Sequence, residues 1–157
     1  MLIPKTLTVA IVAAILFGTS VGVLAASDHA HHGGGVAHLQ LNEGRKWPTD
    51  APLRQGMGNM QAAMSQALPQ IHHGKLDAAG YAALAARLER EMAYVVANCK
   101  LDPDADAQLH LVLAQLGAGL EQMKAGGDRR AGAVSVVDAL DAYGTHFDHP
   151  GWHALRH

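Results

Sequence analysis

Histidine is the residue type with the clearest chemical potential in this chain. There are 11 histidines among 157 residues, and most fall into two groups near the ends. The first group is His29, His31, His32 and His38, and the second is His146, His149, His153 and His157. Imidazole is the commonest metal ligand in proteins and titrates near neutral pH. The pattern therefore predicts a protein that binds a metal ion or a haem.

Sulfur ligands accompany these imidazoles. The single Cys99 and the methionines of the first predicted helix supply thiolate and thioether groups, which together with imidazole suit copper, above all Cu(I). Zinc bound through Cys and His is the alternative. The predicted metal ligands are Cys99, His110, His149 and Met57, with His146 and Met60 as second choices and His29 near the N-terminus. Each also has a purely structural explanation, since methionine commonly fills cores and histidine favours helix C-termini.

The N-terminal region predicts export. Residues 1–26 combine Lys5, an uncharged apolar run and small residues before a polar segment, as in a secretory signal peptide. The apolar run is also long enough for a membrane anchor. We expect the periplasm as the location, residues 27–48 as a flexible His- and Gly-rich leader, and residues 49–157 as the folded domain.

The position of signal cleavage has a chemical consequence. Cleavage after Ala26 would expose Ser27-Asp28-His29 as the new N-terminus. A free amine, two backbone nitrogens and an imidazole at position three form a square-planar set that suits Cu(II) or Ni(II). Cleavage after Ala25 would spoil this set by moving His29 to position four.

Charge and motif content exclude several classes of function. Without Lys5 the chain has 11 basic and 14 acidic side chains, a formal charge of −3, which does not indicate nucleic-acid binding. No nucleophile motif or phosphate loop is present, so we expect no enzyme activity. The expected partner is a metal ion, with no nucleic acid, no stable membrane association after signal cleavage, and a homodimer left open.

Apolar residues recur at spacings of three and four from Asp50 onward, which predicts four helices and no strands. The expected ranges are about 50–73, 77–100, 102–125 and 130–146, bounded by Asp caps, Pro residues and glycines. On the last helix, Val134, Val137, Leu140 and Tyr143 are expected to face inward. The predicted fold is all-α, an antiparallel up-down-up-down four-helix bundle with a disordered N-terminal leader.

This topology would gather the candidate ligands. The starts of the first and third helices and the ends of the second and fourth meet at one end of such a bundle. Met57, Cys99, His110 and His146 all fall within a few turns of that end. The sequence therefore predicts a Met/Cys/His metal cluster there, for copper buffering or resistance.

Three strings carry a resemblance to a known family. KWPTD (46–50) precedes LRQGM (53–57), and NCKL (98–101) precedes Leu109-His110. The third string, FDHPGW (147–152), follows the last predicted helix. Over about residues 39–155 the chain resembles a family of small exported bacterial four-helix-bundle proteins, some encoded beside copper-handling genes. The resemblance implies the bundle and export and favours copper, but it supplies no established activity.

Two alternatives to copper remain open. The chain has a looser topological similarity to soluble b-type cytochromes, which implies haem b with Met57 or Met60 and His146 as axial ligands. Covalent c-type attachment is excluded because C-x-x-C-H is absent. The last alternative is a cofactor-free periplasmic adaptor protein.

Overall fold

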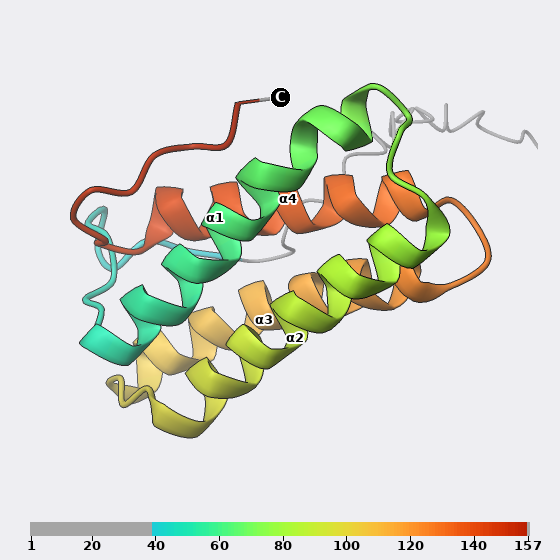
Figure 1. Ribbon diagram of the computed structural model, residues 1–157. Coiled ribbons are helices and arrows are strands. Elements are labelled where there is room, and N and C mark those ends of the chain that lie inside the picture. Colours follow the sequence, from blue (N-terminus) through green and yellow to red (C-terminus); the bar gives the residue numbers. More distant parts are fainter. Residues whose placement is uncertain (1–38, 157) are drawn as a thin grey trace, which may run out of the picture. The chain divides into compact units, whose positions relative to one another are not determined.

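The computed structural model describes residues 39–156. The predicted signal peptide, the leader up to residue 38 with His29, and His157 lie outside the described residues. Four helices form the domain: α1 (Ala51–His72), α2 (Ala78–Asn98), α3 (Pro103–Lys124) and α4 (Arg129–His146) (Figure 1). The described residues contain two isolated bridges and no strand, so the predicted all-α four-helix fold is confirmed. Within 39–156, no helix is both long and apolar enough to cross a membrane.

Local sequence signals account for where the helices begin. The carboxylates of Asp50, Asp77 and Asp128 each accept a hydrogen bond from the backbone N–H three residues later, at 2.7–3.0 Å. Such bonds satisfy helix N–H groups that have no partner within the helix. Asp102 makes no such bond, and Pro103 starts α3. The helix limits predicted from caps, prolines and glycines agree with the structure to within one or two residues.

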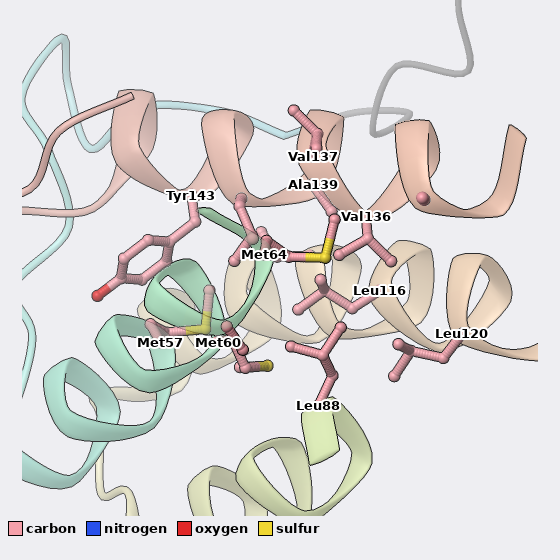
Figure 2. Packing of buried hydrophobic residues seen from close by; sticks show 14 of the residues in the cluster. Met57, Met60, Met64, Leu88, Leu116, Leu120, Val136, Val137, Ala139 and Tyr143 are labelled. Atoms are coloured by element: carbon pink, nitrogen blue, oxygen red, sulfur yellow. The ribbon is translucent and has the colours of Figure 1, made fainter. Parts of the chain in front are cut away.

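The core is aliphatic and rich in methionine. Met57, Met60 and Met64 of α1 are fully buried and belong to one cluster with Leu88, Leu116 and Tyr143 (Figure 2). Burying a side chain of this size stabilises the fold by about 1.5–3 kcal/mol. The methionine stripe of α1 is thus part of the hydrophobic core.

The four helices do not pack equally. α3 and α4 share by far the most extensive contact, α1 packs on α2 and α2 on α3, while α1 and α4 barely touch. Close approach of α3 and α4 depends on two glycines. A Cβ atom at Gly132 would lie 2.7 Å from the carbonyl oxygen of Gly119, and one at Gly119 would lie 2.8 Å from the carbonyl oxygen of Gly132.

One predicted core residue is not in the core. Val134 was expected to face inward on α4, and this prediction is wrong because 51% of the residue is exposed. Its neighbours Ala133 and Val136 are buried. Val134 faces the side of α4 toward α1, where the two helices make little contact, so no neighbouring helix covers it.

Candidate functional site

The structure brings the start of α1 together with the ends of α2 and α4. The backbone N–H of Lys100 donates to Asp50 Oδ2 at 2.6 Å, and the N–H of Trp47 donates to the carbonyl of His146 at 2.8 Å. The candidate ligands are predicted at this end of the domain.

Residues 39–48, which belong to the predicted leader, contact the bundle. The backbone N–H of Gln40 donates to Gln108 Oε1 of α3 at 2.7 Å, and Trp47 Nε1 donates to the carbonyl of Gln40. Leu39 and Trp47 pack against the core. This part of the chain therefore contributes to the fold.

Residues 147–156 form a second covering segment, which we call the strap. The strap turns back after α4 and runs beside α4 and α1 (Figure 1). It begins beside Trp47, where the N–H of Asp148 donates to the Trp47 carbonyl at 2.8 Å. A turn closed by a 3.0 Å bond from the N–H of Trp152 to the carbonyl of His149 redirects it, with Gly151 at φ +81°. Glycine suits this left-handed conformation because it has no Cβ.

The strap docks on α4 through aromatic contacts. The ring centroid of Trp152 lies 4.8 Å from that of Tyr143, and a Cβ at Gly144 would overlap the indole of Trp152. Leu155 is 7% exposed and joins the core, and Gln61 of α1 donates to the carbonyl of His153. The strap thus covers part of the seam between α1 and α4.

His149 is held by a buried tyrosine. Its Nδ1 lies 3.0 Å from the hydroxyl of Tyr143. Burial raises the pKa of Tyr143 well above its usual value, so the hydroxyl stays protonated. Burial and the charge of Arg54 lower the pKa of His149, which favours the neutral imidazole. Both pKa shifts agree with a hydrogen bond in which the protonated Tyr143 hydroxyl donates to Nδ1 of the neutral His149.

Cys99 and His110 lie in different settings. Cys99 is the half-buried C-cap of α2, and burial, followed by the charges of Asp50 and Asp106, raises its pKa. The side chain of His110 is 66% exposed, with Nδ1 3.4 Å from Asp106 Oδ2. A raised thiol pKa disfavours the thiolate, which is the form that binds metals.

The described residues contain no ready-made His/Cys/Asp/Glu metal site. Among residues 39–156, no group of three or more His, Cys, Asp and Glu side chains is placed to hold a metal ion. Met57 and Met60 lie in the core, and the Nδ1 of His146 is 2.8 Å from the carbonyl of Ala142 in its own helix. His29 lies outside the described residues. Copper or zinc binding therefore stays a prediction.

The residues present do not fit a haem between α1 and α4. Met57 and Met60 are fully buried in the same cluster as Tyr143 (Figure 2). Trp152 packs against Tyr143 and directly over Gly144 of α4. A haem that used His146 and either methionine would have to displace these aromatic rings.

A groove that sequence reasoning missed lies along the part of the α1–α4 seam beyond the strap. One cavity of about 340 Å³ is lined by Leu68, Ile71, His72, Arg130, Ala133, Val134, Val137 and Asp138. A second, of about 380 Å³, shares Leu68 and His72 with the first and is closed on one side by strap residues His153, Leu155 and Arg156. We call the two together the α1–α4 groove. No motif in the sequence indicates this groove, and the exposure of the apolar residue Val134 becomes evident only in the structure.

No family model, curated protein or solved structure matches this chain.

Proposed function

We propose that this protein is an exported binding protein that holds a small, largely apolar ligand in the α1–α4 groove. The observation that carries the proposal is the apolar cavity between α1 and α4, which are in far less contact with each other than α1 with α2, α2 with α3 or α3 with α4. Ligand sites are typically concave, mostly apolar and about 300–1,000 Å³ in volume.

The order of the helices explains why this seam is open. We take the helices to run up-down-up-down, since the connections at 73–77, 99–102 and 125–128 are too short to cross a bundle. Each connection ties one helix to the next in sequence. No connection ties α4 back to α1, so this seam depends on packing alone.

The chemistry of the lining favours an apolar guest. Val134 is 51% exposed, whereas Val137, Leu68 and Ile71 are between 3% and 6% exposed and form the floor of the groove. Contact with a ligand would remove the exposed part of Val134 from water, at about 25 cal/mol per Å² of apolar surface. The remaining described exposed large hydrophobic residues, Leu41 and Val96, do not line this groove.

The test uses 1-octanol as a neutral apolar probe and follows methyl resonances by NMR. We expect saturable shifts at Ile71, Val134 and Val137 and an increase in Tm, because a ligand that binds only the folded state stabilises it. Val134→Asp should abolish the shifts. Val96→Asp, which adds the same charge to an exposed valine on α2, should leave them intact. Shifts spread over all methyl groups, or equal binding by Val134→Asp, would contradict the proposal.

A second candidate function is copper capture by the leader, and the histidine string favours it. His29, His31, His32 and His38 lie within ten residues of one another, outside the described residues. If export leaves Ser27 as the N-terminus, His29 takes position three of a square-planar nitrogen site. This site would act independently of the bundle.

Copper capture is tested on the protein isolated after export. We expect one Cu(II) to bind with the visible absorption band of a square-planar nitrogen site, and His29→Ala to remove that band. His110→Ala, which changes an exposed histidine of the bundle, serves as the control. An unchanged spectrum in His29→Ala would show that the leader does not bind copper in this way.

A further inference from the structure

The charged groups around the α1–α4 groove are unevenly distributed. Arg130 lines the apolar cavity and Arg156 lines the neighbouring cavity. His72 lines both cavities and His153 lines the second. Asp138 is the one carboxylate among the lining residues. The groove therefore joins an apolar floor to a predominantly basic rim.

Neither arginine of the rim forms an ion pair with a carboxylate of the described residues. Among residues 39–156, the ion pairs involve only Lys124 with Glu89 and Glu121, and His110 with Asp106. A guanidinium with free donors is suited to bidentate recognition of a carboxylate. Arg130 also lies in the first turn of α4, at the positive end of the helix dipole.

We propose that the ligand of the α1–α4 groove is a free long-chain carboxylate. Its aliphatic tail lies on Leu68, Ile71 and Val137, and its carboxylate pairs with Arg130 at the rim. This inference rests on the proposed function, because it assigns a chemical class to the ligand of that groove.

The test compares three ten-carbon probes below their critical micelle concentrations: decanoate, 1-decanol and decyltrimethylammonium. We expect decanoate to bind about tenfold more tightly than decanol, the gain typical of a hydrogen bond to a charged group. Decyltrimethylammonium should bind more weakly than decanol because its head carries the same sign of charge as the rim.

Neighbouring arginines provide a matched pair of variants. Arg130→Gln should remove the preference, so that the variant binds decanoate and decanol with about equal affinity. Arg129→Gln removes the same charge one residue earlier in α4 but from outside the cavity lining, and it should retain most of the preference. Asp138→Asn should raise the affinity for decanoate several-fold, since it removes the one negative group from the lining.

The outcomes separate the two proposals. Equal affinity for decanoate and decanol would overturn the carboxylate assignment while the groove remained a binding site. Failure of all three probes to bind would overturn both proposals. Binding to a lipid surface is tested with phosphatidylglycerol vesicles. If the protein binds the vesicles but not monomeric decanoate, the partner is a membrane surface and the assignment of a free carboxylate is wrong.

Discussion

The two sides of α4 differ in how completely they are packed. Toward α3 the backbones approach so closely that neither Gly119 nor Gly132 has room for a Cβ atom. Toward α1 there is little direct contact, and the strap and the α1–α4 groove occupy the seam instead. One helix thus carries a dense structural interface and an open one. The difference indicates that stability is concentrated at α3–α4 and that the α1–α4 seam is the part available for binding.

The largest effect is expected at the dense interface. In Gly132→Val, the new Cβ would lie 2.7 Å from backbone atoms of α3, which cannot move aside as a flexible side chain would. We expect the free energy of unfolding to fall by about 3 kcal/mol, as measured by urea denaturation. Gly117→Val is the control, because a Cβ there has nothing within 4 Å. It should change stability by less than about 0.5 kcal/mol.

Equal effects of the two glycine substitutions would show that close approach of α3 and α4 does not limit stability. If Gly132→Val fails to fold, the smaller Gly132→Ala provides the measurement. In Gly132→Ala, overpacking should lower the free energy of unfolding by about 1–3 kcal/mol. The higher helix propensity of alanine should offset about 1 kcal/mol of this loss.

The next effect is expected where the strap docks. Trp152→Ala removes the aromatic contact with Tyr143, and because Trp152 is only half-buried we expect a loss of about 2 kcal/mol, less than for a fully buried tryptophan. The strap should also become susceptible to limited proteolysis after Phe147. A protected strap in Trp152→Ala would mean that Leu155 and the strap hydrogen bonds suffice to hold it.

Gly144→Ala approaches the same contact from the helix side. A Cβ at this position overlaps the indole of Trp152, but the ring can move, so we expect a smaller loss of about 1 kcal/mol. In the Trp152→Ala background, Gly144→Ala should instead be neutral or stabilising, because the obstacle is gone and alanine favours helix. A double-mutant cycle measures this coupling, and additive effects would contradict it.

The smallest effect is expected in the pH dependence of stability. The pKa of His149 is lower in the folded protein than its ordinary value of about 6.5, so the unfolded chain binds more protons as pH falls below that value. This residue therefore contributes stability at pH 7 that is lost progressively toward pH 5. His149→Asn should flatten this part of the pH profile in urea denaturation. An unchanged slope would mean that other groups determine it.

Sequence reasoning predicted the fold better than the site. Caps such as Asp50 and Asp77 act through residues three positions away, so the helix limits follow from local rules. Helix lengths and short connections also predict that His146 and Asp50 lie at the same end of the domain. They do not predict where the side chains point: His110 lies near that end but points to solvent, and the Nδ1 of His146 faces its own helix.

The groove could not be predicted for a different reason. Periodicity assigned Val134 to the core because it recognises an apolar stripe and not whether a neighbouring helix covers it. The groove is also bounded by long-range packing, because Leu155 of the strap joins the core and lines one of the two cavities. Only the ordinary apolar residues of α1 and α4 line the groove floor, and they carry no motif.

The pairing of Trp47 with Phe147 has a consequence for folding kinetics. Contacts between α1 and α2, or between α3 and α4, join neighbouring parts of the chain and close short loops. The Trp47–Phe147 bridge joins residues one hundred positions apart, so its formation requires a much larger loss of chain entropy. We expect the two helical hairpins to form first and the strap to close over the α1–α4 seam last. The seam that we assign to ligand binding would then also be the first to open in the native protein.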